Sequence, residues 1–251
     1  MSVIPVLLII LFLLMKFIGG ERGTKSFFTL CFNFIVFFIM VILIANKLNP
    51  ITVTIMVCII ISSITLFYIN GWNKKTISSL ISVTTVVIVT ILLTYKMGMG
   101  AKIQGFGKEQ FDSIASLSIY IKLNFSKIVI CEILIGLIGA VIDVSISISS
   151  SMNEIYINNP SITKKNLFDS GMNIGRDILG TMTNTMFFAY ISGFMALIIY
   201  FSSLNYSVAD IINNKVFCSE VFQILCSGIG IILIIPITAI VTSQILLSVN
   251  D

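Results

Sequence analysis

The sequence predicts an all-α membrane protein, a polytopic bundle of about seven transmembrane helices forming a single integral-membrane domain over residues 1–251. Hydrophobic residues make up 57% of the chain and charged residues only 10%, whereas soluble domains are typically about 45–50% apolar and about 25% charged. Mean hydropathy is +1.07. The apolar residues also gather into runs long enough to cross a bilayer core. Such a chain can fold only with most of its surface facing lipid.

The first four spans are expected at 3–18, 27–45, 51–69 and 77–95. The first run lacks the positive n-region and small-residue cleavage site of a signal peptide, so we expect it to be retained. The other three are each near 19 residues, close to the about 20 that a spanning helix needs. A polar loop at 19–25, the Asn49-Pro50 turn and a loop around Trp72 separate the four spans.

The long segment 96–127 separates the fourth span from the fifth. Its glycine-rich first part, 98–107, is expected to be irregular. Apolar residues at helical spacing then predict an amphipathic interfacial helix at about 108–124.

The last three spans are expected at 128–151, 174–201 and 221–247, with Pro236 as a possible kink in the final one. A second interfacial helix is predicted at about 207–217. Its N-cap would be Ser207, with Asp210 three residues on.

Basic residues suggest the orientation of the chain in a bacterial plasma membrane. Loops two and six hold only Lys47 and Lys215, and loop four holds five lysines as an exception. The first, third and fifth loops hold most of the remainder: Lys16, Arg22, Lys25, Lys74, Lys75, Lys164, Lys165 and Arg176. We therefore expect the N-terminus outside and the C-terminus in the cytoplasm.

Polar residues form a stripe on each of the fifth and sixth spans, within about 80° of arc at 100° per residue. On the fifth span these are Glu132, Gly136, Gly139, Asp143, Ser147, Ser150 and Glu154. On the sixth they are Ser170, Asn173, Asp177, Gly180 and Asn184. Unpaired polar groups in hydrocarbon cost several kcal/mol each, so these stripes are not expected to face lipid.

Asp143 is the principal candidate, because an ionisable residue deep in a span is by default functional. It should lie about 12 Å inside the membrane from Ser151, and Asn184 should lie opposite at similar depth. The predicted ion, proton or substrate pathway consists of Asp143, Asn184, Glu132, Asp177 and Asn173. A charged cluster at the cytoplasmic edge is predicted from Glu154, Arg176 and Asp177. Helix packing is expected at Gly136, Gly139 and Gly180, with Ser147, Ser149, Ser150 and Thr181 as further packing residues.

Several chemistries are disfavoured. The chain has no histidine, and its five cysteines form no C-x-x-C pair, so no metal or other cofactor is expected. No Walker A loop or compact basic domain is present, which disfavours nucleotide and nucleic-acid binding. An intramembrane aspartyl hydrolase would need Asp143 and Asp177 at one site. Asp177 should lie several ångströms shallower, and no G-x-G-D pattern occurs, so no enzyme activity is predicted.

Several motifs carry a resemblance that covers essentially the whole chain. They are GAVIDVSISISSS at 139–151, LFDSGMNIGRDILGTMTNT at 167–185, NGWNKKT at 70–76, IQGFG at 103–107 and SGIGIILIIPITA at 227–239. With these motifs the chain resembles the YibE/F family of bacterial membrane proteins. The family's longer type carries a soluble region before its spans, so this chain is similar to the shorter, YibF-type member. The resemblance implies a possible YibE-type partner subunit and, at most, a transport role.

A weaker similarity links the fifth span to the Asp-bearing spans of resistance-nodulation-division permeases. There a glycine-rich approach leads to an intramembrane Asp, as Gly136 and Gly139 lead to Asp143 here. The large extracytoplasmic domains of those pumps have no counterpart in this chain.

Two functions are expected to compete. In the first, the protein is a secondary permease or permease subunit, and protonation or ion binding at Asp143, helped by Asn184, biases the packing of spans five and six. In the second, it is a non-transporting membrane subunit, and the stripes are the interface with a YibE-type partner or with other copies of this chain. Membrane lipids surround the protein in both cases.

Overall fold

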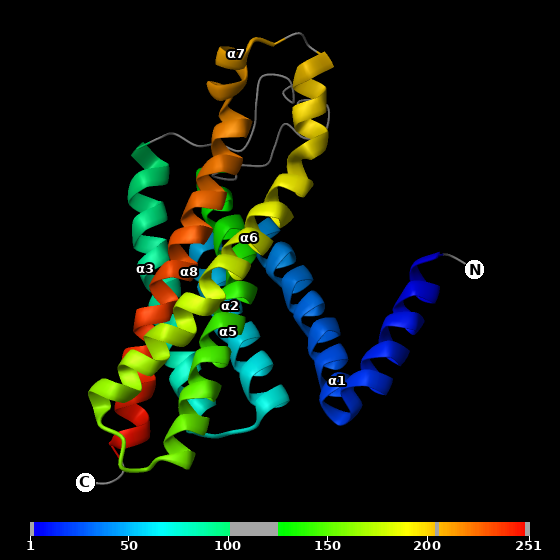
Figure 1. Ribbon diagram of the computed structural model, residues 1–251. Coiled ribbons are helices and arrows are strands. Elements are labelled where there is room, and N and C mark those ends of the chain that lie inside the picture. The colour runs from blue at the N-terminus through cyan, green and yellow to red at the C-terminus, as the bar shows by residue number, and fades with distance from the viewer. Residues whose placement is uncertain (1–2, 101–124, 204–205, 249–251) are drawn as a thin grey trace.

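The computed structural model describes residues 3–100, 125–203 and 206–248, and within these ranges the chain is built from helices without strands. Six of these helices are long and apolar enough to cross a membrane, which confirms the all-α membrane fold (Figure 1). The helices are α1 Val3–Ala45, α2 Pro50–Asn70, α3 Lys74–Gly100, α5 Phe125–Asn158, α6 Lys164–Ser203, α7 Val208–Ile212 and α8 Lys215–Leu247.

The first two predicted spans both lie in α1, a 43-residue helix that breaks at Gly20. Gly20 has φ 56°, a left-handed conformation that glycine adopts at little cost. The rest of the predicted loop at 19–25 is helical, so the chain reverses through one residue (Figure 1). At the bend, a Cβ on Gly23 would collide with the Met15 backbone. Whether each arm crosses the membrane separately, giving seven spans, stays a prediction.

Other boundaries also differ from the predicted ones. Helix α3 continues to Gly100, so residues 98–100 are helical rather than irregular. Helix α6 begins at Lys164 instead of residue 174, because Thr163 accepts the backbone N–H of Asn166 at 3.3 Å and caps its first turn. Helix α8 runs without interruption through Pro236.

The segment before α8 is shorter than expected. Ser207 and Asp210 form the predicted capping box, but α7 ends at Ile212 and α8 starts after a new N-cap, Asn214. The interfacial helix predicted at 108–124 lies outside the described residues.

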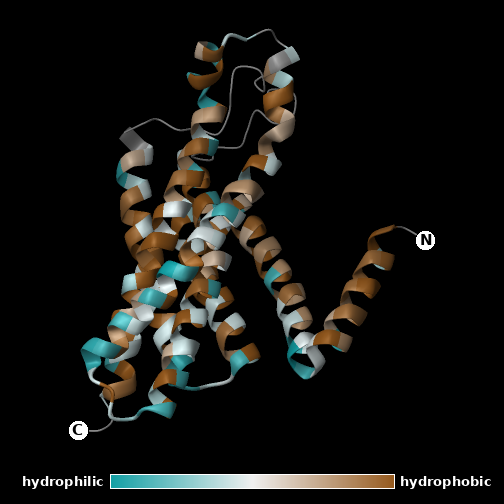
Figure 2. Cartoon of the chain, in the orientation of Figure 1, coloured by the Kyte–Doolittle hydropathy of each residue, from teal (hydrophilic) through white to brown (hydrophobic). Residues whose placement is uncertain are grey.

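Helix α5 is the centre of the bundle and packs against α2, α3, α6 and α8. Its buried side chains interlock with α3 and α8, while α6 crosses α5 and α8 on the outside (Figure 1). Figure 2 shows the two arms of α1 as almost entirely hydrophobic, and most of their large apolar side chains are exposed. Such exposure is expected of helices that contact lipid. The fully buried large side chains of α5 are Ile130, Ile133, Leu134, Leu137, Ile148 and Met152.

The connections gather at two ends of the bundle. The α1 bend, the α2–α3 connection, the α5–α6 turn and the last turn of α8 lie at one end, here called the hairpin end (Figure 1). The start of α8 and α7 lie at the other, the α7 end. The first, third and fifth loops of the predicted topology therefore share one side. Which side is cytoplasmic stays a prediction.

Candidate functional site

The polar stripe predicted on the fifth span forms the exposed face of α5, the helix at the centre of the bundle. Between Ser126 and Tyr156, the exposed residues of α5 are Glu132, Gly136, Gly139, Asp143, Ser147 and Glu154. All six belong to the stripe, and its remaining member, Ser150, is half-buried. The other faces of α5 are covered by neighbouring helices. Between Ser126 and Tyr156 the described helices therefore enclose α5 everywhere except along its charged and glycine-rich side.

The opposite side of α5 also carries polar residues, but these are paired inside the bundle. Ser149 and Ser79 of α3 share a 2.6 Å hydrogen bond between their hydroxyls. Ser145 accepts a 3.1 Å hydrogen bond from Thr238 of α8. Nearby, Thr242 of α8 donates to Ser78 of α3 at 3.2 Å. We call these six buried residues the hydroxyl seam. It joins α3, α5 and α8, and it confirms that Ser149 is a packing residue.

Asp143 lies near the middle of α5, 18 residues from Phe125 and 15 from Asn158. Its backbone carbonyl accepts a 2.7 Å hydrogen bond from Ser147. Its carboxylate has no hydrogen-bond or ion-pair partner among the described residues. At about 1.5 Å per residue this position is close to the membrane midplane of any arrangement that centres α5 in the bilayer.

The register between α5 and α6 sets what lies level with Asp143. A Cβ on Gly171 would meet Met152, and a Cβ on Gly136 would meet the Tyr190 hydroxyl. Counting inward from these two contacts along the antiparallel pair places Asp143 level with residues 180–183. Asn184 is therefore nearly level with Asp143 along the two helices, and the depth of both in a membrane stays a prediction. No hydrogen bond joins the two side chains in the described structure, and both are exposed.

The stripe on α6 is also open. Asn173, Asp177, Gly180 and Asn184 are exposed, and Ser170 is half-buried. Arg176 donates a 3.0 Å hydrogen bond to the Asn173 amide oxygen. Among the described helices no ion pair links Arg176 to Glu154 or Asp177, so these residues form no closed charge cluster within the single chain.

The predicted packing glycines divide into two kinds. Gly136 is a close contact, because a Cβ there would collide with Tyr190. At Gly139 and Gly180 a Cβ would meet nothing within 4 Å, so neither brings together two of the described helices. The close contacts on α6 are instead Gly171 and Gly175, where a Cβ would meet Met152 and Ile235.

Sequence reasoning missed a polar cluster at the α7 end, where α8 and α6 meet Gly136. The Tyr190 hydroxyl is hydrogen-bonded to Ser227 at 3.0 Å and lies beside the Gln223 amide. Glu132 precedes Gly136 by about one helical turn and Glu220 precedes Gln223 by nearly one turn, so both carboxylates lie on the α7 side of this cluster. A signal was present in the sequence, since Glu220, Gln223 and Ser227 recur at helical spacing on the last span.

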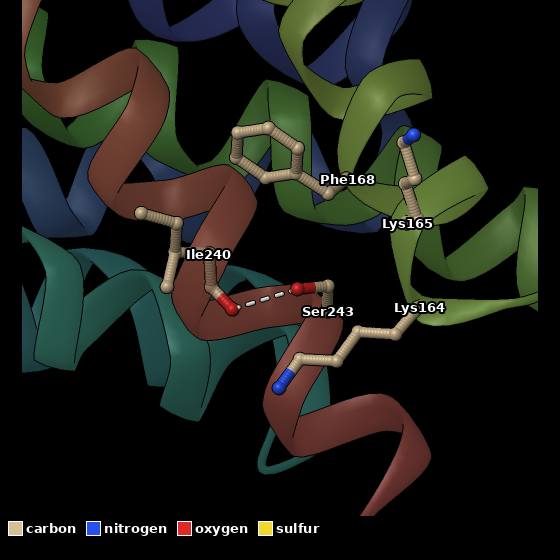
Figure 3. Close-up of a pocket in the computed structure, with 5 residues that line it drawn as sticks. All are labelled: Lys164, Lys165, Phe168, Ile240 and Ser243. Carbon is tan, nitrogen blue, oxygen red and sulfur yellow. Dashed lines mark hydrogen bonds between the residues drawn. The ribbon is translucent and has the colours of Figure 1, made fainter.

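A separate cavity of about 440 Å³ lies at the hairpin end between α6 and α8 (Figure 3). It is lined by Lys164, Lys165, Phe168, Ile240 and Ser243. The Ser243 hydroxyl is already bonded to the Ile240 carbonyl at 2.8 Å, and the two lysine side chains point in different directions. The cavity is thus a surface recess beside the turn and does not include Asp143.

Comparison with known protein families identifies the family of this chain. Residues 7–248 match the family model described as YibE/F-like protein. The comparisons with curated proteins and with solved structures found no match. The similarity to resistance-nodulation-division permeases finds no support in them. In the described helices, no group of three or more His, Cys, Asp and Glu side chains is placed to hold a metal ion.

Proposed function

Because the chain belongs to the YibE/F-like family and its long helices are suited to a membrane, we propose that it is a secondary permease or the membrane subunit of one. Asp143 is the ion or proton site in this proposal, and Asn184 and Glu132 lie along the same pathway. Asn173 and Asp177 extend it towards the hairpin end on α6.

One observation carries this proposal: a carboxylate without a partner among the described residues lies midway along the central helix, on the one face that the described helices leave open between Ser126 and Tyr156. A charge at the bilayer centre costs at least about 2.5 kcal/mol. The face around Asp143 must therefore meet water, an ion or another protein rather than lipid alone. Binding a proton or cation removes the net charge, so the two forms of Asp143 favour different surroundings for α5 and α6.

The test uses purified protein in liposomes that contain a pH-sensitive dye. Proton flux is followed after a potassium diffusion potential is imposed, with and without a sodium gradient. We expect flux through the unmodified protein and the loss of it in Asp143→Asn. Glu154→Gln is the matched control, because Glu154 is on the same stripe but at its hairpin end. Unchanged flux in a well-folded Asp143→Asn protein, or no flux in the unmodified protein, would contradict the proposal.

A second candidate is a non-transporting subunit that assembles with a YibE-type partner or with other copies of the chain. The open space at Gly139 and Gly180 favours it, because small residues on membrane helices allow another helix to approach closely. Replacing either glycine with Leu would then abolish co-purification of the complex. Gly193→Leu is the control, since Gly193 is equally open but on another face of α6. Retention of the complex in all three variants would exclude this interface.

A further inference from the structure

The cavity between α6 and α8 differs in charge from a second cavity of the same volume. Two of its five lining residues are lysines, and no acidic side chain lines it. The second cavity, also of about 440 Å³, lies between α1 and α2. Its α1 residues follow the bend and its α2 residues are in the last two turns, so it too lies near the hairpin end. Its lining contains no charged residue: Phe28, Thr29, Cys31, Phe32, Ile35, Ile64 and Tyr68.

The charged and apolar residues of the first cavity occupy different depths. Its two lysines are the first two residues of α6, whereas Phe168 is about one turn further into the bundle. On α8, Ser243 is four residues and Ile240 seven residues from the helix end at Leu247, about 6 and 10 Å at 1.5 Å per residue. The cavity therefore has its charge in the outermost turn of α6, and its apolar walls extend towards the centre of the bundle (Figure 3).

These depths match the boundary between lipid headgroups and hydrocarbon. Helix α8 has 33 residues, about 50 Å at 1.5 Å per residue, and a hydrocarbon core is about 30 Å thick. If α8 is centred in the bilayer, about 10 Å of it extends beyond the core at each end. Ser243 is then level with the headgroups, and Ile240 is level with the start of the acyl chains. The first turn of α6 shares this level, because it lines the same cavity.

The two lysines of this cavity are available for an anionic group. Neither side chain has a hydrogen-bond or ion-pair partner among the described residues. The first turn of α6 contains no acidic residue, and Asp169, the nearest one on that helix, does not line the cavity. Both lysine side chains are exposed and flexible, and they flank the cavity on different sides (Figure 3). Clusters of basic residues at a membrane surface attract anionic lipids, and the hairpin end holds further ones: Arg22, Lys25, Lys74 and Lys75.

We propose that this cavity binds one anionic glycerophospholipid, with the phosphate at Lys164 and Lys165 and the start of an acyl chain against Phe168 and Ile240. Its volume of about 440 Å³ is within the range of about 300–1,000 Å³ that small-molecule sites occupy. The cavity between α1 and α2 accepts acyl chains without a preference for the headgroup, because it has no charged lining residue. This inference goes beyond the proposed permease function and does not depend on Asp143.

The test measures lipid contacts through tryptophan fluorescence, which brominated acyl chains quench. Trp72, the only tryptophan of the chain, is replaced by Phe. One new tryptophan is then placed in the charged cavity, as Phe168→Trp or as Ile240→Trp on the opposite wall, or in the uncharged cavity, as Phe32→Trp. The proteins are reconstituted in bilayers of phosphatidylglycerol and phosphatidylcholine in varied proportion, with one of the two lipids brominated. The quenching curves give the relative binding constant of the anionic over the zwitterionic lipid at each position.

In the charged cavity, we expect phosphatidylglycerol to be preferred by roughly fivefold for each lysine that contacts the phosphate. In the uncharged cavity we expect almost no preference. Lys164→Gln with Lys165→Gln should abolish the preference, whereas Lys74→Gln with Lys75→Gln is the matched control and should leave it unchanged. The control pair is also adjacent and at the hairpin end, but it does not line the cavity.

Three outcomes would overturn the lipid site. The first is an equal preference in the two cavities, and the second is a preference that survives the substitution of Lys164 and Lys165. The third is the absence of quenching by either lipid in the charged cavity. Inorganic phosphate at matched ionic strength should not alter the preference, and its loss would show that the site binds a free anion instead. Native mass spectrometry of the unmodified protein, with retained phosphatidylglycerol that the lysine double variant loses, tests the same site without a tryptophan substitution.

Discussion

The two polar faces of α5 both carry serines but have opposite environments. On one face, Ser145 and Ser149 are fully buried and hydrogen-bonded to side chains of α3 and α8. On the other, Asp143 and Ser147 are exposed, and the Asp143 carboxylate has no partner among the described residues. The hydroxyl seam satisfies its hydrogen bonds within the chain. The Asp143 carboxylate of the stripe has no partner in the residues that the structure describes, which is why we assign function to the stripe and stability to the seam.

Two glycines of α6 show the same contrast between a buried and an exposed environment. A Cβ at Gly175 would collide with Ile235, whereas a Cβ at Gly180, about one and a half turns further on, would meet no atom within 4 Å. Small residues in membrane helices are often grouped as packing motifs. Here the two glycines have different surroundings, so substitution should separate them.

The largest expected effect is in the chemical accessibility of the two faces of α5. In a protein without native cysteines, Ser147→Cys should react readily with a water-soluble maleimide, while Ser145→Cys should stay unmodified until the protein is denatured. The reason is that Ser145 is fully buried and Ser147 is exposed. Mass spectrometry after timed labelling measures the difference. Equal labelling of both positions would remove the distinction between the two faces.

The second-largest expected effect is a change in the free energy of unfolding when glycines of α6 are replaced by Ala. Gly175→Ala should destabilise the protein by about 1–3 kcal/mol, because its Cβ would overlap the branched Ile235 side chain. Gly180→Ala should change stability by no more than about 0.5 kcal/mol. Unfolding in mixed micelles with increasing sodium dodecyl sulfate gives both values. A larger loss in Gly180→Ala than in Gly175→Ala would mean that α6 packs through its other face.

A smaller effect is expected from the hydroxyl seam. Ser149→Ala should cost about 0.6 kcal/mol, the typical value for a hydrogen bond between membrane helices. The cost stays low because Ser79 keeps its 2.9 Å bond to the Lys75 carbonyl. Ser147→Ala, which changes the same side chain on the open face, should be neutral within about 0.5 kcal/mol. A double-mutant cycle between Ser79 and Ser149 isolates the coupling, and no coupling would show that the seam contributes little.

The smallest effect concerns Asp210, a carboxylate with hydrogen-bond partners in α7, whereas Asp143 has none among the described residues. Hydrogen bonds from the Ser207 hydroxyl and backbone N–H hold the pKa of Asp210 below its usual 3.8. A lowered folded-state pKa stabilises α7 above about pH 4. That contribution disappears as pH falls through the folded-state pKa. Amide hydrogen exchange in α7 should therefore quicken on acidification, and Asp210→Asn should remove this pH dependence. Asp169→Asn, an exposed carboxylate on α6, is the control.

Much of the fold and part of the site were predictable from local signals. Long apolar runs predicted the helices, the Ser207–Asp210 pair predicted a helix start, and a 3.6-residue period placed Asp143 on one stripe with Glu132. The bend at Gly20 was harder to predict, because a single left-handed glycine replaces what reads as a seven-residue loop. Glu132 and Gly136 were predicted on their own stripe, but the cluster around Tyr190 escaped because its members come from three helices that only the tertiary structure brings together.

The sequence by itself determined that this is a helical membrane protein and that α5 and α6 carry polar stripes, since hydropathy and helical periodicity depend only on neighbours along the chain. Tertiary structure alone decided which polar groups are satisfied. Ser145 meets Thr238, 93 positions away, while Asp143, two residues earlier, meets no pairing side chain within the described parts of the chain. The physical reason is that a buried polar group is stabilised by a partner in space. Polar residues can therefore stabilise the bundle on one face of a helix and form a candidate ion pathway on the other.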